Sequence, residues 1–302
     1  MIDPSPVEGL PDQDESGPDA GEGETSTRGR VIRRILVALD ASSNSRAAMA
    51  AAIGLAETLK TEVHGLFVED INLLRLAELP FAREVLFAET GLRQLERDSL
   101  ARKLHARAAI LRREIEELAT EHQIVSSFQV RRGSVNKELL SEALDSDLLV
   151  IGRMGQSISR RIRLGSTARA IVDQSRSAVL LVKSDVGIGP IIALYDGSAV
   201  GRRVLELASE LSSQSGDLRV LVWAATEAEA FESRQLAVRI LGHSPTKTQF
   251  QHLSGDNPQL VLEWVNRQKG SLLLIGGGAT TIPADIFQTL LDEAEQHILV
   301  IR

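Results

Sequence analysis

Apolar positions along the chain form short unbroken runs that alternate with stretches of helical periodicity. The first run, residues 35–39, ends at Asp40, and alanines and leucines at helical spacing follow in residues 47–59. Runs of the same kind occur at residues 63–68, 124–130, 148–151 and 178–182. Continuous apolar strands separated by amphipathic helices are typical of a parallel sheet that is covered on both faces.

The same order of elements begins again after a short segment rich in glycine and proline, residues 183–190. The apolar run at 191–195 ends at Asp196, just as the first run ends at an aspartate. Two copies of one α/β unit are therefore predicted, residues 31–183 and 190–302. We expect two tandem, open, parallel sheets of five strands each, with helices on both faces in a Rossmann-like arrangement.

Composition narrows the function classes. Residues 1–30 are rich in Pro, Gly, Ser, Asp and Glu, which predicts a disordered acidic tail. The net charge of −7 and an aromatic content of 3% argue against a nucleic-acid-binding surface, which needs basic patches and stacking rings. The absence of cysteine excludes disulfides, thiolate catalysis and cysteine-bearing metal sites.

Neither a catalytic set nor a metal-binding set of residues stands out. The six histidines are too far apart in sequence to form a local ligand pair. No apolar run is long enough to span a membrane, and the start of the chain lacks the pattern of a signal peptide. A cytoplasmic location is therefore expected.

The most informative segment is a glycine-serine loop that follows the apolar run at 148–151. It has the pattern G-x2-G-x9-G-S, with glycines at Gly152, Gly155 and Gly165 and a serine at Ser166. Glycines allow a backbone to approach a phosphate closely, and backbone N–H groups at a helix start bind anions. The loop lies where open α/β sheets bind ligands, at the carboxyl end of a strand.

The charge of this segment supports the same interpretation. Residues 152–172 carry five arginines and no acidic residue, in a chain that is acidic as a whole. The arginines are Arg153, Arg160, Arg161, Arg163 and Arg169. Their local positive field would attract a polyphosphate, although a solvated arginine face is the alternative for any one of them. Asp40 has two candidate roles as well: it either caps the following helix or accepts hydrogen bonds from a ribose or adenine.

These residues together resemble the universal stress protein family, and more closely its ATP-binding branch. The resemblance rests on the order of elements, on Asp40 after the first strand, on Val68 near the end of the second strand, and on the G-x2-G-x9-G-S loop. It implies a fold of the adenine nucleotide alpha hydrolase type. It also implies that ATP or a related adenine nucleotide binds with Mg²⁺ or Mn²⁺. The residues expected to contact the nucleotide are Asp40, Val68, Gly152, Arg153, Gly155, Gly165, Ser166 and Thr167.

Two regions depart from the family pattern. In the second copy the loop after residue 275 is shorter, and Ala284-Asp285 replaces the closing Gly-Ser, so we expect this copy to lack a phosphate site. In the first copy residues 69–104 form a long charged insertion within a stretch, residues 71–121, that we expect to be mostly helical. The insertion is interpreted as a lid, a partner surface, or a helix packed on its own domain.

Three function classes remain. The first is a stress-response regulatory protein that binds an adenine nucleotide; the others are a non-nucleotide interaction module and a slow ATPase or nucleotidyl-transfer enzyme. Family members often pair through their last strands, here residues 178–182 and 297–301. As sheet edges, these strands predict either a homodimer or pairing of the two copies within one chain.

Overall fold

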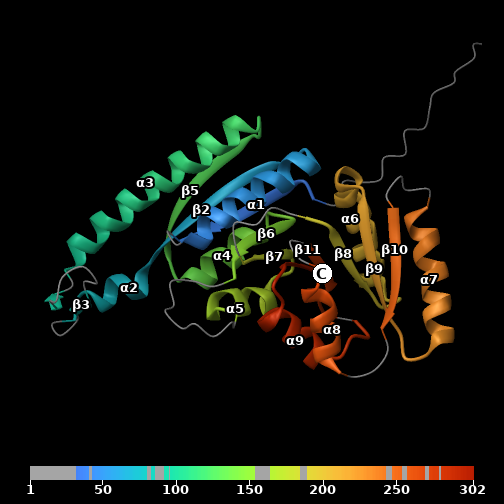
Figure 1. The fold of residues 1–302 in the computed structure, drawn as a ribbon. Coiled ribbons are helices and arrows are strands. Elements are labelled where there is room, and N and C mark those ends of the chain that lie inside the picture. Colours follow the sequence, from blue (N-terminus) through green and yellow to red (C-terminus); the bar gives the residue numbers. More distant parts are fainter. Residues whose placement is uncertain are drawn as a thin grey trace, which may run out of the picture. The chain divides into compact units, whose positions relative to one another are not determined.

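The computed structural model describes most of the chain beyond the N-terminal segment (Figure 1). The described residues are 32–40, 43–79, 83–85, 92–94, 96–153, 164–183, 189–242, 247–253, 257–268, 272–278 and 280–302. The tail expected at residues 1–30 lies outside them, and so does most of the linker, residues 184–188. Among the described residues, no helix has both the length and the apolar character needed to cross a membrane.

The first half of the sheet contains five parallel strands, in the order β7-β6-β1-β2-β5. The strands are β1 (Arg34–Leu39), β2 (Glu62–Asp70), β5 (Ser126–Gly133), β6 (Leu148–Gly152) and β7 (Ala178–Val182). The helices are α1 (Ser43–Leu59), α2 (Ile71–Leu76), α3 (Arg97–Glu121), α4 (Val135–Ala143) and α5 (Ser166–Gln174). The apolar runs in the sequence predicted each of these strands.

The second half repeats the order, as β10-β9-β8-β11-β12. Its strands are β8 (Ile191–Tyr195), β9 (Asp217–Trp223), β10 (Lys247–Leu253), β11 (Leu272–Gly276) and β12 (His297–Ile301). Its helices are α6 (Ala199–Ser215), α7 (Glu227–Leu241), α8 (Pro258–Asn266) and α9 (Ala284–Glu293). The sequence analysis assigned no element to α7. The sequence does contain a signal for its start, because Thr226 is followed three residues later by Glu229, as in a capping box. In the structure Thr226 accepts a hydrogen bond from the Glu229 N–H.

The two halves form one continuous sheet of ten strands rather than two separate sheets. Strand β12 pairs with β7 in the antiparallel direction, with Leu299 opposite Leu180. Each of these strands also has a parallel neighbour, β11 and β6, so neither is an edge. The last strands therefore pair within the chain, and they offer no free edge for a second copy. The edges of the ten-stranded sheet are β5 and β10.

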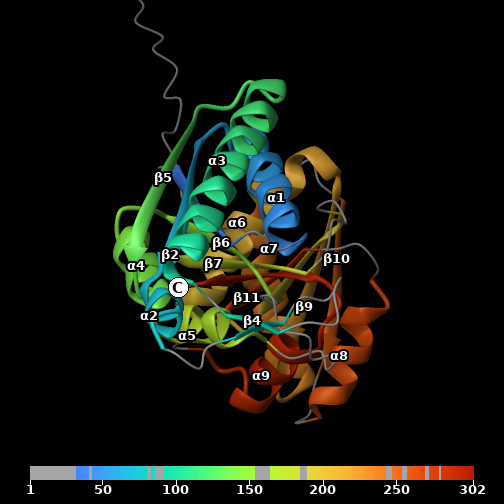
Figure 2. The ribbon, with the colours of Figure 1, turned by 90° about the vertical axis from the view of Figure 1, so that its left-hand side faces the viewer.

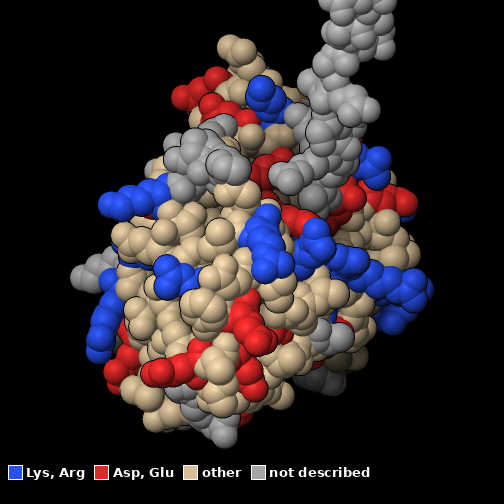
Figure 3. Space-filling model, turned by 90° about the vertical axis from the view of Figure 1, so that its right-hand side faces the viewer, with Lys and Arg blue, Asp and Glu red and all other residues tan. Residues whose placement is uncertain are grey.

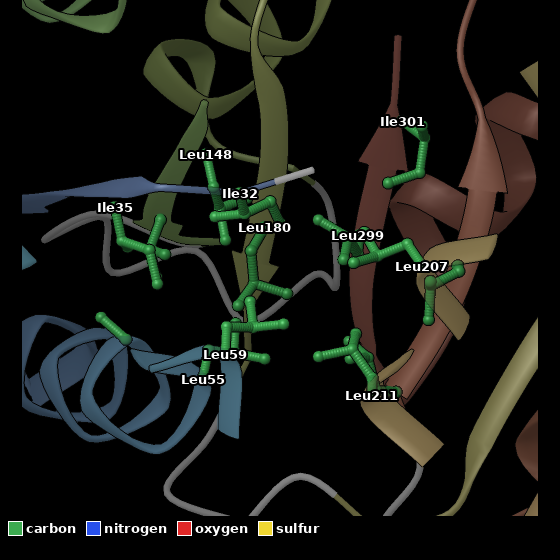
Figure 4. Close-up of a cluster of buried hydrophobic side chains, with 14 of the residues drawn as sticks. Ile32, Ile35, Leu55, Leu59, Leu148, Leu180, Leu207, Leu211, Leu299 and Ile301 are labelled. Carbon is green, nitrogen blue, oxygen red and sulfur yellow. The ribbon is translucent and has the colours of Figure 1, made fainter. Parts of the chain in front are cut away.

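Alternation along the strands divides the core into two layers. Helices α1, α3, α6 and α7 cover one face, and α4, α5, α8 and α9 cover the other. Figures 1 and 2 show this separation for the first half, with α1 and α3 on one side of the sheet and α4 and α5 on the other. Figure 4 shows that the first layer continues across the β7–β12 junction, where Leu180 of one half approaches Leu299 of the other. Both leucines are fully buried, so the junction is part of the hydrophobic core.

The insertion at 69–104 is less helical than the sequence analysis expected. The short helix α2 is followed by β3 (Arg83–Val85) and β4 (Leu92–Gln94), which pair as an antiparallel hairpin. Helix α3 begins only at Arg97. The helical stretch expected from 71 to 121 is thus two helices separated by a hairpin. The roles of a lid and of a partner surface remain predictions.

Candidate functional site

The sheet topology creates a switch point between β1 and β6. Strands added after β1 extend the sheet on one side, through β2, and strand β7 extends it on the other side, beyond β6. Ligands of open α/β sheets bind at such a point, outside the carboxyl ends of the strands. Asp40 follows β1 directly, and Gly152 is the last residue of β6. The sequence analysis therefore selected residues at the position where the fold favours a ligand.

Strand register brings three of the predicted residues to the same edge of the sheet. Leu39 lies opposite Phe67 on β2, so the next pair along is Asp40 and Val68. On the other side of β1, Val37 lies opposite Val150, and continuing this register places Gly152 beside Leu39. Val68 is half-buried against the core layer of α4 and α5, whereas Asp40 is exposed. The apolar side chain of Val68 and the carboxylate of Asp40 are thus neighbours at the strand ends.

The carboxylate of Asp40 is linked to the start of α1. The Ser45 hydroxyl donates to Asp40 Oδ1 at 2.7 Å, and the Asp40 N–H donates to Ser45 Oγ at the same distance. Ser45 itself is buried. The contact fixes the position of Asp40 while its side chain stays accessible from solvent.

Gly152 is required by a close approach of α1. A Cβ atom added at Gly152 would lie 2.8 Å from Asn44 Cβ, closer than side chains in proteins tolerate. The glycine therefore allows β6 and the start of α1 to come together at the switch point. This reason differs from the phosphate contact that the sequence analysis gave, and the two are compatible.

The second end of the loop is the N-terminus of α5. Gly165 is its N-cap residue, with φ −60° and ψ 152°, and no side chain accepts a hydrogen bond at this cap. The Gly165 N–H donates to the Arg153 carbonyl at 3.0 Å, which joins the two ends of the loop. Ser166 is exposed and Thr167 half-buried. The first N–H groups of a helix have no partner within it, so this end of α5 offers donors to an anion.

Arg153 is engaged elsewhere. Its guanidinium is buried and donates to the carbonyl oxygens of Leu291 and Ala294, at the C-terminal end of α9. Burial lowers the pKa of Arg153 to about 10, and the nearby Asp292 carboxylate partly opposes that shift. The Arg153 N–H donates to the Val182 carbonyl at 2.7 Å. In this structure the side chain binds the second half of the chain rather than pointing to the switch point.

The middle of the loop is not among the described residues. Gly155 and the arginines at 160, 161 and 163 all lie in residues 154–163, which the structure does not describe. Their predicted roles stay predictions. Arg169 is described, and it contacts α9: its guanidinium donates to Asp292 Oδ1 and to Gln288 Oε1, each at 2.5 Å.

The equivalent position in the second half is filled by the protein itself. Asp196 is only 8% exposed, and its Oδ1 accepts hydrogen bonds from the N–H and the hydroxyl of Ser198. Its Oδ2 accepts from the N–H of Thr281, at 2.7 Å, in the loop after β11. Asp196 therefore organises both the start of α6 and the loop after β11.

One face of the second half exposes side chains of both charges (Figure 3). The face in Figure 3 shows acidic and basic side chains interspersed among neutral ones. Within the described residues, no group of three or more His, Cys, Asp or Glu side chains is arranged to hold a metal ion.

The comparisons with known proteins agree with this architecture. The model of the universal stress protein family matches residues 32–183. A universal stress protein from Archaeoglobus fulgidus DSM 4304 is similar in structure, with a TM-score of 0.67 and 16% identity, over 88% of this chain and 97% of that one. A functionally unknown protein from Pseudomonas aeruginosa PAO1 gives a TM-score of 0.59 and 16% identity, over 91% and 94%. At these identities the structures establish the fold alone. No curated protein matches the chain.

Proposed function

This chain belongs to the universal stress protein family, and from that premise we propose that its first half binds ATP or a related adenine nucleotide at the switch point between β1 and β6. One observation carries the proposal. Asp40 and Val68 are neighbours at the ends of β1 and β2, and Gly152 lies beside Leu39 at the end of β6. The N-terminus of α5, which has no side-chain cap, is hydrogen-bonded to Arg153 directly after β6. This combination offers an apolar contact, a carboxylate and N–H donors within one site.

Each of these groups has a role in the proposal. Val68 contacts the adenine ring, and the exposed Asp40 carboxylate accepts hydrogen bonds from the ribose. The N–H groups of Ser166 and Thr167 and the Ser166 hydroxyl donate to the phosphates, where the positive end of the helix dipole favours negative charge. Gly155, which lies outside the described residues, is proposed to contact the phosphates as well. The Arg153 contribution is limited to its backbone, because its side chain binds α9.

Gly165 supports a ligand at this place. Its φ and ψ are angles that any residue adopts, so its backbone conformation does not demand a glycine. In the proposal, the missing side chain leaves space for a closely approaching phosphate. Mg²⁺ or Mn²⁺ enters with the nucleotide on its phosphate oxygens, since the described residues hold no metal-binding group of their own.

The experiment identifies the small molecule that purified protein carries and measures ATP affinity by calorimetry. Ser166→Ala removes one charge-assisted hydrogen bond and is expected to weaken binding by about 1.5–3 kcal/mol, or roughly 10- to 150-fold. Gly165→Ala fills the space of a phosphate and should also weaken binding. The matched control is Asp285→Ala, at the equivalent first turn of α9, which should bind as the wild type does.

The result also separates the other two function classes. Protein that carries no nucleotide and shows no stabilisation by ATP would support an interaction module, because bound ligand at a hundredfold excess over Kd stabilises by about 2.7 kcal/mol. Rapid release of ADP would support an enzyme. Retention of the nucleotide by both Gly165→Ala and Ser166→Ala would overturn the assigned site.

A further inference from the structure

Both ends of the β6–α5 loop are held by one helix of the other half. At its start, Arg153 donates to carbonyl groups at the end of α9. At its end, the Leu164 N–H donates to Asp292 Oδ1 at 3.2 Å, and Arg169 donates to the same oxygen at 2.5 Å. Asp292 is therefore the point where α9 meets the N-terminus of α5.

The corresponding loop of the second half, which follows β11, is held by different residues. The residue equivalent to Arg153 is Gly277, as shown by the matching hydrogen bonds that Gly277 and Arg153 donate to the Ile301 and Val182 carbonyls. A guanidinium still lies there, but it comes from the strand end: a Cβ at Gly277 would lie 3.1 Å from Arg302 Nη1.

Asp173 is the position on α5 that corresponds to Asp292 on α9. Each lies two residues before its helix C-cap, Ser175 and Ala294. Burial lowers the pKa of Arg302, and Asp173 partly opposes this shift, so Asp173 acts on the strand end. Asp292 thus accepts hydrogen bonds at the end of the β6–α5 loop, whereas Asp173 acts on Arg302 through its charge.

From this asymmetry we propose that Asp292 is a positioning residue of the nucleotide site in the first half, supplied by the half that has no such site. The inference rests on the proposed function. By holding the Leu164 N–H and Arg169 together, Asp292 fixes the first turn of α5 before the nucleotide arrives. Preorganised donors bind an anion more tightly, because less ordering remains to be done on binding. The second half therefore acts as a clamp on the loop.

The test measures ATP affinity for three variants of the full chain. Asp292→Ala removes the acceptor and is expected to weaken binding about tenfold. Asp292→Asn keeps an oxygen for the Leu164 N–H and should recover most of that loss, which a purely structural defect would not. Asp173→Ala, at the equivalent position of the first half, should leave affinity unchanged. Wild-type affinity in Asp292→Ala, or an equal loss in Asp173→Ala, would overturn the proposal.

Hydrogen exchange and a second variant separate a positioning role of Asp292 from a folding defect. Hydrogen exchange of the amides at residues 164–168 in nucleotide-free protein should be faster in Asp292→Ala, a readout that does not depend on nucleotide binding. If Asp292→Ala does not fold, Arg169→Gln removes the same ion pair from the other side and should weaken ATP binding. Combined with Asp292→Asn, its effect should be less than additive. Faster exchange without any ATP binding by the wild type would contradict the proposed function while leaving the clamp intact; unchanged exchange would contradict the clamp.

Discussion

An aspartate follows the first strand of each half, but the two aspartates have different surroundings. Asp40 is exposed at the switch point of the first half. Asp196, at the same point of the second half, is buried under Thr281 and Ser198 of its own half. The Asp40 side chain is thus accessible to a ligand. The Asp196 carboxylate is already hydrogen-bonded to groups of the protein. This difference in the surroundings of one carboxylate supports the proposal that only the first half binds a nucleotide.

Neighbouring positions show the same divergence. Strand register places Trp223 where the first half has Val68, because Phe67 lies opposite Leu39 and Val222 opposite Tyr195. A tryptophan thus stands at the position of the valine that is proposed to contact the adenine. The start of α9 carries Asp285 in its first turn, whereas α5 has no acidic residue there. An acid at this place repels phosphate, which supports the proposal that the second half has no phosphate site.

Where the halves meet, they are alike, and this is where the largest effect is expected. Leu180 and Leu299 face each other across the junction and are fully buried. Leu180→Ala and Leu299→Ala should each lower the free energy of unfolding by about 2–5 kcal/mol, because each leaves a cavity. Urea denaturation followed by circular dichroism measures both. A large difference between the two variants would show that the halves do not contribute equally to the core.

The two aspartates should respond in opposite ways. Asp40→Ala is expected to weaken ATP binding by roughly 1.5–3 kcal/mol, with a smaller effect on unfolding. Asp196→Ala leaves the N–H groups of Ser198 and Thr281 without acceptors, so it should lower stability by about 1–3 kcal/mol. Calorimetric titration and thermal unfolding of both variants measure the contrast. Loss of ATP affinity in Asp196→Ala alone would reverse the assignment of the halves.

The smallest expected effect is a pH dependence of stability that comes from the first half. Burial, and then the Arg34 charge, lower the pKa of His64 on β2 below 6.5. As the pH falls, His64 is protonated in the unfolded chain before it is protonated in the folded protein. The contribution of neutral His64 to the free energy of unfolding is therefore fully present above pH 6.5 and decreases below it. His64→Gln should reduce this decrease between pH 6.5 and 5 in urea titrations. Arg219→Gln, at the same register position of β9, should keep the wild-type dependence. Equal curves for His64→Gln and wild type would exclude His64 as the cause.

The strands were predictable because a strand buried on both faces has to be apolar throughout, as residues 148–151 and 272–275 are. The candidate site was predictable to the extent that it lies at strand ends, as Asp40 and Gly152 do. Pairing of β7 with β12 was left open between one chain and two, since the apolar pattern is the same in both cases.

Other features depend on the folded arrangement. Arg153 and Leu164 contact α9, which lies more than a hundred residues away in sequence, so local spacing says nothing of these contacts. The burial of Asp196 likewise requires the position of Thr281, which follows from the docked loop. The hairpin of β3 and β4 is formed by strands of three residues, too short to produce a pattern.

The central claim is that only the first half binds a nucleotide. Equilibrium dialysis with radiolabelled ATP and Mg²⁺ measures the number of bound molecules per chain directly. We predict one ATP per chain for the wild type and for Asp196→Ala, and a value near zero for Asp40→Ala at the same ATP concentration. Two molecules per chain, or one that persists in Asp40→Ala and disappears in Asp196→Ala, would contradict the account.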